Sequence, residues 1–394
     1  MSPAGPGPRG QALLVAVCTV AVGVFLVTVP TFRHFFDLGV YRGAVGSWLL
    51  DGGDLYAYRY QGTEYGFTYP PFAALVFSPL IALSWPVAVA VSVLLNAGAV
   101  AVLLRWFLVP VLRRNDWPVW TPCALAFLAI VVFEPARDTF SFGQVNLALL
   151  VLVCADLRAL RRDSRWAGVG IGIATAIKLT PAVFIGYLIV ARRYRAAAVA
   201  TGTTAAATLL AAVVAPGESR TFWTDALWDT DRVGKLAYVS NQSLRGVVAR
   251  LDGGAAWWLL LVAAALAGWF VLARRADPAA GFALTGILAC LISPVTWVHH
   301  LVWLLPALFL LAGDALERRD RTRLVLLALG YGVLSSSVVW LWWAGTQGWL
   351  AAVGSSTYVW ISLGLFAAVG FMRRENDDRA TARVGGPGRT GAGS

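Results

Sequence analysis

Long apolar stretches, separated by short polar connections, run through most of the chain. A helix that crosses a bilayer straight needs about 20 apolar residues. Several stretches are shorter, and Pro and Gly blur their limits, which membrane helices tolerate. The pattern predicts an all-α, polytopic membrane protein with about 12 transmembrane helices, at residues 11–29, 86–108, 119–133, 143–158, 166–177, 180–191, 196–215, 256–273, 279–293, 300–313, 323–343 and 354–371.

Composition supports the membrane assignment. Of the 394 residues, 58% are hydrophobic and 13% are charged, whereas soluble domains carry about 25% charged residues. So few charges cannot cover a surface that faces water. The four Cys lie inside apolar stretches, which favours small buried hydrophobic residues over disulfides or metal ligands. The excess of Arg over Lys, with much Ala, Val and Gly, is typical of a GC-rich bacterial genome, so we expect a bacterial plasma membrane.

The net charge of +11 has a topological explanation. Arg and Lys gather in the cytoplasmic loops of multi-pass proteins, so we expect no nucleic-acid partner. Basic residues follow every second apolar stretch, which places both termini in the cytoplasm. These residues are Arg105, Arg113, Arg114, Arg158, Arg161, Arg162, Arg165, Arg192, Arg193, Arg195, Arg274, Arg275, Arg318, Arg319, Arg321, Arg323, Arg373 and Arg374.

The same pattern divides the chain into three parts. Residues 1–10 form a cytoplasmic N-terminus, residues 11–371 a single transmembrane domain, and residues 372–394 a disordered cytoplasmic tail without apolar periodicity. The first apolar stretch resembles a signal peptide, but no clear cleavage site follows it, so we expect an uncleaved helix. The stretch from Phe72 to Leu83 is only 12 residues long and is bracketed by prolines. A crossing there would invert every later loop, so we interpret it as a re-entrant or interfacial piece of the first outer loop, 30–85.

Polar residues of chemically useful types fall on the outer side in this topology. The first outer loop contains Asp37, Asp51, Asp54 and Glu64, with several Tyr and a Tyr-Pro-Pro turn at Tyr69. Further outer segments are 134–138, 143–146, 178–181, 216–255, 293–300 and 344–353. The inner loops carry mostly Arg, so we expect any chemistry on the non-cytoplasmic side.

Asp37 is the candidate for catalysis within this loop. If 37–51 is helical, Asp37, Tyr41, Trp48 and Asp51 fall near one face, as in a helix that lies in the membrane interface. The competing interpretation is that Asp37 is a helix N-cap. Asp51-Gly-Gly-Asp54 has a spacing that could hold a divalent cation, although Asp and Gly also make ordinary turns.

Bases and amides on the outer side could bind an anion or a sugar. Lys178 interrupts an apolar stretch, where it either snorkels or faces a cavity, and phosphate is its natural partner. His299 and His300 are adjacent, so both cannot easily bind one metal, and no metal site is expected. Gln242, Arg245 and Arg250 are further candidates for phosphate or sugar contacts. No nucleotide-binding loop, zinc motif or hydrolase elbow occurs in the sequence.

Taken together, these segments resemble the polyprenol-phosphate-mannose-dependent α-(1→2)-mannosyltransferases of actinobacteria, glycosyltransferase family 87 of the GT-C superfamily. The resemblance rests on FDLGVYRGAV, GGDLY, FTYPPFAALVFSPL, FGQVNLALLVL, GIGIATAIKLTPAVF, SNQSLRGVVAR and SPVTWVHHLVWLLPAL, in the expected order between residues 35 and 310. No single piece is specific, but the ordered set is.

The resemblance implies a GT-C fold with interfacial helices in the first outer loop and an inverting transfer from a polyprenyl-phosphate-linked sugar on the non-cytoplasmic face. It maps the family's first-loop aspartate to Asp37, as general base, and its late histidine to the His299–His300 pair without choosing between them. The donor's phosphate and sugar would meet Lys178, His299, His300, Arg245 and Gln242. Supporting or groove positions would be Tyr41, Asp54, Tyr69, Gln144 and Asn146.

The chemistry fits these residue types independently. An alcohol acceptor must lose a proton as it attacks, which calls for one positioned carboxylate. The departing phosphate is already a good leaving group, so its charge needs cations or hydrogen-bond donors rather than a strong acid. We therefore expect a metal-independent enzyme without a cofactor, acting on a glycolipid or lipoglycan acceptor.

Two alternatives stay open at the level of sequence. An arabinofuranosyltransferase that uses polyprenyl-phosphate-arabinose would share every feature named above. A transporter or flippase for lipid-linked sugars would be expected to show inverted repeats and charges near the membrane midplane. No convincing repeat is present, and the polar groups lie at the outer ends of the apolar stretches. The sequence also leaves the acceptor and the oligomeric state undetermined.

Overall fold

The structure, a computed structural model, describes residues 7–29, 31–229, 232–344 and 348–384. Every regular element in these ranges is helical, which confirms the all-α prediction. The α-helices are α1 (Pro8–Thr28), α2 (Phe36–Leu50), α3 (Pro71–Phe77), α4 (Trp85–Arg114), α5 (Trp120–Val132), α6 (Glu134–Phe142), α7 (Asn146–Arg161), α8 (Val169–Ile177), α9 (Val183–Val190), α10 (Tyr194–Val214), α11 (Pro216–Thr221), α12 (Leu244–Arg250), α13 (Ala255–Ala273), α14 (Pro278–Ile292), α15 (Leu305–Arg318), α16 (Arg321–Ser335), α17 (Trp349–Ser355) and α18 (Thr357–Val384). Short tighter turns include η2 (Ser78–Ala82), η3 (Thr180–Ala182), η6 (Val298–Leu304) and η7 (Val338–Trp342).

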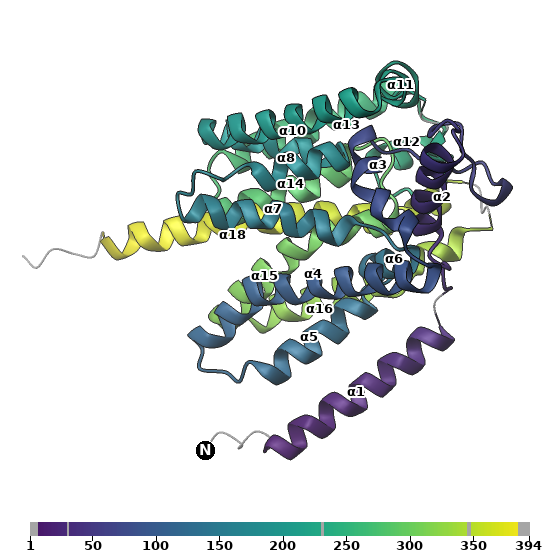
Figure 1. Ribbon diagram of the computed structural model, residues 1–394. Helices are drawn as coiled ribbons and strands as arrows, with labels where there is room; N and C mark the ends of the chain where they lie inside the picture. Colours follow the sequence, from purple (N-terminus) through teal and green to yellow (C-terminus); the bar gives the residue numbers. More distant parts are fainter. Residues whose placement is uncertain (1–6, 30, 230–231, 345–347, 385–394) are drawn as a thin grey trace, which may run out of the picture.

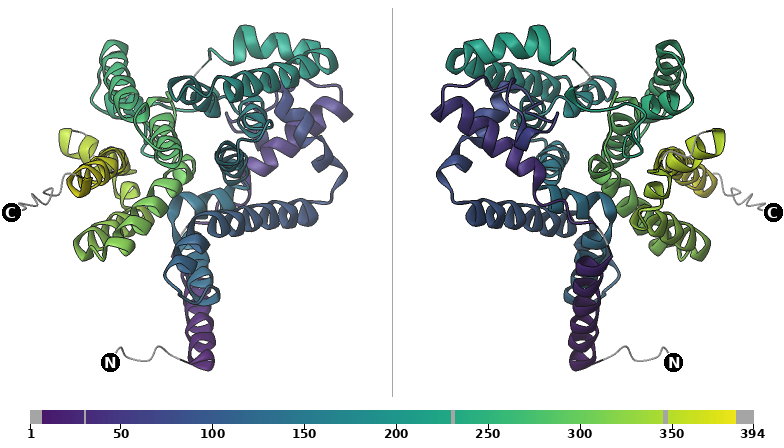
Figure 2. Two further views of the ribbon diagram at one scale, coloured as in Figure 1. Left: turned by 90° about the vertical axis from the view of Figure 1, so that its left-hand side faces the viewer. Right: turned by 90° about the vertical axis from the view of Figure 1, so that its right-hand side faces the viewer.

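The long helices run side by side, and the short ones gather at one end of the bundle. Figure 1 shows α2, α3, α6, α11 and α12 toward the right, whereas the α4–α5 connection and the far end of α18 lie toward the left. The view along the bundle in Figure 2 shows α1 projecting from the other helices. This helix has no buried residue, as expected for an apolar helix whose surroundings are lipid.

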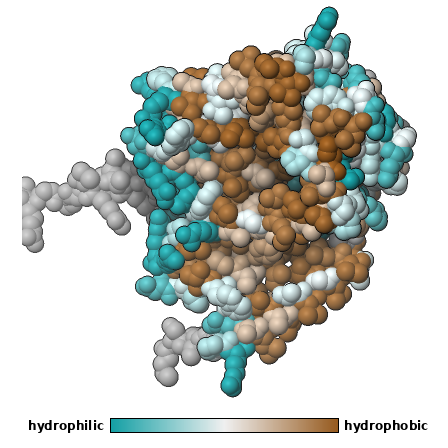
Figure 3. Space-filling view, in the orientation of Figure 1, coloured by the Kyte–Doolittle hydropathy of each residue, from teal (hydrophilic) through white to brown (hydrophobic). Residues whose placement is uncertain are grey.

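Five helical stretches within the described residues are long and apolar enough to cross a membrane, or up to seven if each of two bent pairs forms one span. The five are α1, α4, α10, α13 and the continuous η6–α15 segment. Figure 3 shows a broad hydrophobic zone between hydrophilic groups at the two ends of the molecule. A multi-pass membrane protein is therefore confirmed, while the number of about 12 crossings stays a prediction.

The stretch from Phe72 to Leu83 is not one long helix. Pro71 begins α3, which has seven residues, and Pro79 lies near the start of the tight turn η2, which ends at Ala82. Seven residues of α-helix rise only about 10 Å, far less than the roughly 30 Å of a bilayer core. This short element packs against α2 and α10, as expected for a piece of the first outer loop.

Helix α2 forms where the sequence predicts an amphipathic helix. Its buried face carries Leu38, Tyr41, Ala44 and Val45 at helical spacing. Gly43 on this helix lies directly beneath the Tyr58 ring, and a Cβ there would overlap the Tyr58 hydroxyl. The absence of a side chain thus allows the rest of the outer loop to close over α2.

A sharp turn between α6 and α7 brings two further polar side chains to the same end. The two helices meet at 117°, and Gly143 ends α6 in the left-handed conformation with φ of 70°. A Cβ on Gly143 would lie 2.6 Å from the Leu38 Cβ, so only glycine lets the turn approach α2 this closely. The turn places Gln144 and Asn146 beside Asp37 and Lys178.

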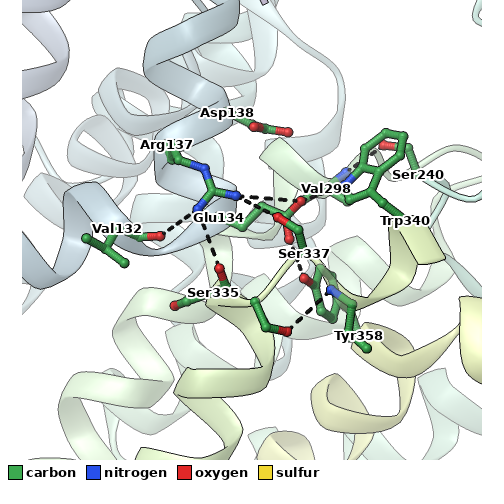
Figure 4. Close-up of polar contacts among 12 residues, drawn as sticks. Val132, Glu134, Arg137, Asp138, Ser240, Val298, Ser335, Ser337, Trp340 and Tyr358 are labelled. Atoms are coloured by element: carbon green, nitrogen blue, oxygen red, sulfur yellow. Dashed lines mark hydrogen bonds and ion pairs between the residues drawn. The ribbon is translucent and has the colours of Figure 1, made fainter. Parts of the chain in front are cut away.

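A buried polar cluster holds α6 against the C-terminal elements (Figure 4). Glu134, only 1% exposed, accepts hydrogen bonds from Trp340 Nε1 at 2.6 Å and from the Tyr358 hydroxyl. Arg137 approaches Glu134 at 4.0 Å and donates to Ser337 Oγ at 2.7 Å. These contacts connect α6 to η7 and α18, more than 190 residues away in sequence.

Candidate functional site

A cavity of about 510 Å³ opens at the end of the bundle where the short helices gather. Its walls come from α2, the Tyr-Pro-Pro turn, the α6–α7 turn, the α8–η3 junction and η6. Seven of the residues predicted from the sequence line it: Asp37, Tyr41, Tyr69, Gln144, Lys178, His299 and His300. The fold therefore gathers groups that are up to 263 positions apart (300 − 37) in sequence.

Asp37 lies in the first turn of α2 and faces this cavity. It is not the N-cap, because Phe35 occupies that position and no side chain caps the helix. Instead, Asp37 Oδ2 accepts a hydrogen bond from Gln144 Nε2 at 2.8 Å. Burial raises the pKa of Asp37 to about 6, against the opposing effects of this hydrogen bond and of the Lys178 charge. A carboxylate with a pKa near neutrality suits a general base.

The backbone that enters α2 is held in an unusual conformation. His34 and Phe35 both have φ of 53°, a left-handed region that side chains other than glycine rarely adopt. Two contacts to Ser141 in α6 hold the segment: the Phe35 N–H donates to the Ser141 carbonyl at 2.8 Å, and the Arg33 N–H to the Ser141 hydroxyl at 2.6 Å. The position of Asp37 thus depends on α6.

Hydrogen bonds extend from Asp37 across the cavity wall. Gln144 Oε1 accepts from the Tyr69 hydroxyl at 3.0 Å, and the Tyr69 and Tyr41 hydroxyls are 2.9 Å apart. Asn96 in α4 holds the other side of Gln144, because its Nδ2 donates to the Gln144 carbonyl at 3.1 Å. Gln144 is therefore fixed in orientation, with its amide group directed toward the Asp37 carboxylate.

Lys178 occupies the break between α8 and η3, where its own backbone is extended (φ −148°, ψ 128°). Its Nζ contacts Asn146 Oδ1 at 2.9 Å, His300 Nε2 at 3.0 Å and the Tyr69 hydroxyl at 3.3 Å. Burial lowers the pKa of Lys178 to about 7, although the nearby Asp37 carboxylate favours the charged form. This lysine faces the cavity rather than snorkelling away from it.

The two histidines have different surroundings. His300 contacts Lys178 directly, and its Nδ1 accepts a hydrogen bond from the Trp297 backbone N–H at 3.2 Å. The His299 ring packs against Phe142 at 5.1 Å between centroids. Its Nε2 has no hydrogen-bond partner among the residues that the structure describes. Both rings line the cavity, so each could meet a ligand there.

Four predicted site residues, Gln242, Arg245, Asp54 and Asn146, do not belong to the cavity lining. Gln242 is fully buried and its Nε2 donates to the carbonyls of Val239 and Ser355, so it holds the loop before α12. The guanidinium of Arg245 lies over the Trp258 ring at 5.5 Å. Asp54 Oδ1 accepts from the backbone N–H of Tyr56 at 2.7 Å, which is turn chemistry. Asn146 is not in the lining but holds Lys178.

Two arginines that the sequence did not single out do line the cavity, Arg33 and Arg232. The Arg33 guanidinium lies over the rings of Trp340 at 4.8 Å and Phe142 at 5.5 Å, and 3.9 Å from Asp138. Each arginine departs from the rule that short outer loops are poor in basic residues. Basic residues on predicted outer loops are the sequence signal that could have identified these two arginines.

No group of three or more His, Cys, Asp or Glu able to hold a metal ion occurs in the described parts of the chain. Asp229 is a second acidic residue of the lining, but it is exposed, whereas Asp37 is partly buried. Metal independence and the roles of the individual side chains stay predictions.

Comparison with known proteins decides the family. The profile of glycosyltransferase family 87 matches residues 67–294. Over 92% of its length, the chain is 33% identical to 91% of a polyprenol-phosphate-mannose-dependent alpha-(1-2)-phosphatidylinositol mannoside mannosyltransferase of Mycobacterium tuberculosis. The chain belongs to glycosyltransferase family 87. The prediction of a membrane glycosyltransferase, and thus of an enzyme, is confirmed.

Other relatives of this family-87 protein carry similar names. Over 87% of its length it is 34% identical to 80% of a polyprenol-phosphate-mannose-dependent alpha-(1-2)-phosphatidylinositol pentamannoside mannosyltransferase of Mycobacterium tuberculosis.

The crystal structure of ArnT from Cupriavidus metallidurans, bound to undecaprenyl phosphate, has 19% identity and a TM-score of 0.43, with 93% of this chain and 78% of that chain covered. The family profile begins at residue 67, after Asp37, so the profile itself does not include the candidate base.

Proposed function

We propose that this family-87 glycosyltransferase moves mannose from polyprenyl-phosphate-mannose to a hydroxyl group of a glycolipid or lipoglycan, with inversion at the anomeric carbon. The observation that carries the proposal is a partly buried carboxylate, Asp37, in one cavity with a lysine and two histidines. The names of the relatives at 33% and 34% identity support this donor, and support a phosphatidylinositol mannoside as acceptor.

The reaction needs one proton acceptor and one site for negative charge. As the acceptor oxygen attacks the anomeric carbon, its proton passes to Asp37. The bond between that carbon and the phosphate oxygen breaks, and polyprenyl phosphate leaves with the electron pair. A positioned base contributes typically 10²–10⁴-fold to such a step. The negative charge of the leaving phosphate would be stabilised by Lys178 and the histidine pair, which line the cavity.

The lining of the cavity is suited to a sugar attached to a lipid. Tyr65, Trp297 and Trp340 present aromatic rings, on which the apolar faces of sugars can stack, while Leu179 and Val295 offer apolar contact for the first prenyl units. The cavity lies at the end of the bundle where the short helices gather (Figure 1). Figure 3 shows a hydrophobic zone over the body of the molecule, along which a lipid chain could lie.

The proposed side of the membrane is the non-cytoplasmic one. The Arg-rich connections, such as the one between α4 and α5, lie at the end of the bundle opposite α2 and α3 (Figure 1). Because such loops are cytoplasmic in multi-pass proteins, the cavity would open to the outside. There the enzyme would meet a donor that has already been brought across the membrane, which explains the absence of any nucleotide-binding motif.

The decisive experiment replaces Asp37 by Asn. This change keeps the size of the side chain but removes the base, so we expect transfer to fall by about 10²-fold or more, with unchanged insertion and thermal stability. The matched control is Asp51→Asn, at the exposed end of the same helix, which should keep normal activity. Near-normal turnover in Asp37→Asn would overturn the assignment of the base.

The donor is tested in the same assay. Purified wild-type protein is offered polyprenyl-phosphate-mannose or polyprenyl-phosphate-arabinose with extracted phosphatidylinositol mannosides, and the lipid products are analysed by mass. We expect a gain of one hexose with the first donor and no product with the second. A pentose product would replace the proposal by the arabinosyltransferase, and scrambling of lipid in vesicles without any glycosidic product would replace it by a flippase.

A further inference from the structure

The hydrogen bonds around Lys178 determine which atoms carry protons. Gln144 Nε2 donates to Asp37 Oδ2, because an ionised carboxylate can only accept. The Gln144 Oε1 must therefore accept, and it takes the single proton of the Tyr69 hydroxyl at 3.0 Å. The Tyr69 oxygen is then an acceptor for its other two neighbours, Tyr41 at 2.9 Å and Lys178 Nζ at 3.3 Å.

The ring of His300 is fixed by the backbone. The Trp297 N–H points at Nδ1 of His300 over 3.2 Å, so Nδ1 must offer a lone pair. A neutral imidazole carries one N–H, and it therefore lies on Nε2. That nitrogen is 3.0 Å from Lys178 Nζ, so His300 donates to the lysine. The opposite arrangement would set a ring N–H against the backbone N–H of Trp297.

Lys178 then has one acceptor role and two donor roles. Its Nζ donates to Asn146 Oδ1 at 2.9 Å, because Asn146 Nδ2 already donates to the His299 carbonyl at 3.3 Å. It donates to the Tyr69 oxygen and accepts from His300 Nε2. Two N–H groups and one lone pair describe an uncharged amine, whereas an ammonium group has three donors and no lone pair.

We propose that Lys178 rests as an uncharged amine that accepts a hydrogen bond from His300, and that the phosphate of the lipid-linked donor converts this pair to its cationic form by the uptake of one proton from water. The second half rests on the proposed function. In this step R–NH2 and H3O⁺ give R–NH3⁺ and water. The new N–H of Lys178 and the released Nε2–H of His300 then both point to phosphate oxygens.

The surroundings agree with this assignment. The titratable groups near Lys178 are Asp37 on α2, Tyr69 of the outer loop, Cys290 on α14 and His299 beside His300. Burial lowers the pKa of Lys178 to about 7. No ion pair within 4.0 Å joins Asp37 to Lys178 among the residues that the structure describes. The arriving phosphate would supply the close negative charge that the amine lacks at rest.

This proposal can be tested directly because the chain has only two lysines, Lys178 and Lys235. Full-length protein labelled with ¹³C and ¹⁵N in lysine gives two side-chain signals, and Lys235→Arg removes one and so assigns both. At pH 8 without ligand, we expect the Cε and Nζ shifts of Lys178 to be those of an amine, with conversion to the ammonium form near pH 7. Ammonium shifts at pH 8 would overturn the proposal while leaving the transferase function intact.

The ligand arm adds polyprenyl phosphate in detergent at pH 8, with inorganic phosphate in a parallel sample. We expect the lipid to convert Lys178 to the ammonium form, and a conversion by inorganic phosphate would show that the headgroup alone suffices. If Lys178 stays an amine with both, although mass spectrometry shows the lipid bound, the coupling to phosphate is overturned. Failure of the proposed function would appear elsewhere, as no glycosidic product from any donor.

A variant tests the role of the histidine. In His300→Phe the amine loses its donor, so the pH at which Lys178 converts should rise by at least about one unit. The control is His34→Phe, which alters an exposed histidine and should leave the conversion unchanged. An unchanged conversion in folded His300→Phe would remove His300 from the proposal, and if that variant does not fold, the wild-type titration still decides.

Discussion

Burial and hydrogen bonding act on the Asp37 carboxylate in opposite directions. Removal from water raises its pKa, while the Gln144 amide favours the ionised form, as does Lys178, which carries its charge in the pH range where Asp37 titrates; the result is a pKa of about 6. The group is therefore ionised at neutral pH, yet basic enough to take a proton from an attacking hydroxyl. An exposed aspartate, with a pKa of about 3.9, would be a far weaker base.

The pH dependence of turnover follows from this value. The base must be ionised, so activity should be full well above pH 6 and should fall as the pH drops through about 6, where Asp37 takes up a proton. The measurement is kcat at saturating donor between pH 5 and pH 8. A rate that stays constant down to pH 4.5 would contradict Asp37 as the base in its observed environment.

A substitution at Gln144 tests whether its hydrogen bond to Asp37 lowers the pKa of that carboxylate. Gln144→Leu removes the donor to Asp37 Oδ2 while keeping a side chain of similar size. Hydrogen bonds to charged groups contribute about 1.5–3 kcal/mol. Without this bond the pKa of Asp37 should rise, so the pH below which kcat falls should be higher by about one to two units. Activity at pH 6 should then fall more than activity at pH 8. An equal loss at both values would indicate a structural role only.

At the scale of elements, the site depends on how α6 is anchored. This helix positions both Ser141, which holds the entry to α2, and the turn that carries Gln144. Its own anchor is the Glu134 cluster with Trp340 and Tyr358 (Figure 4). A short helix of nine residues is not stable by itself, so these contacts determine where it lies.

Replacing Glu134 by Leu should therefore destabilise the protein strongly. The change leaves the buried Arg137 without its partner at 4.0 Å and removes the acceptor of Trp340 Nε1 and of the Tyr358 hydroxyl. Breaking a buried pair in this way costs about 3–5 kcal/mol, which thermal unfolding in detergent would detect as a lower Tm. Glu64→Gln, on the exposed outer loop, is the control. Equal Tm values for the two variants would contradict the anchoring role.

At the scale of the whole molecule, the distribution of Arg and the position of the cavity together predict a direction across the membrane. Basic residues end α4 and α7, at the end of the bundle away from α2 and α3 (Figure 1). Charge bias of this kind sets the orientation of multi-pass proteins. If the Arg-rich end of the bundle is cytoplasmic, both termini lie in the cytoplasm and the cavity opens to the outside.

Labelling of single cysteines tests this orientation. The four native cysteines are replaced by Ala. Glu64→Cys, between α2 and α3, and Asp163→Cys, between α7 and α8, then each introduce one exposed thiol, and Figure 1 shows these two connections at opposite ends of the bundle. We expect a membrane-impermeant maleimide added to intact cells to label position 64, and to label position 163 only after the membrane is opened. The reverse pattern would place the cavity on the cytoplasmic side.

The sequence by itself determined the class and the family of the protein, and it predicts a direction across the membrane. Apolar length fixes a helical membrane protein, because a bilayer allows few other solutions, and the position of Arg predicts its orientation. The order of the motifs, each formed by neighbouring residues, identified the family and pointed to Asp37 and Lys178.

Only the tertiary structure decided which polar residues meet. Gln242 and Arg245 belong to a segment resembling the family, yet one is a buried loop support and the other packs on a tryptophan. Arg33 reaches the cavity because α6 and η7 lie beside it. The protonation of Lys178 depends on Asn146, Tyr69 and His300. The physical reason is that pKa values and hydrogen bonds depend on distance in space. Spacing along the chain does not specify this distance when the contacts join different segments of the fold.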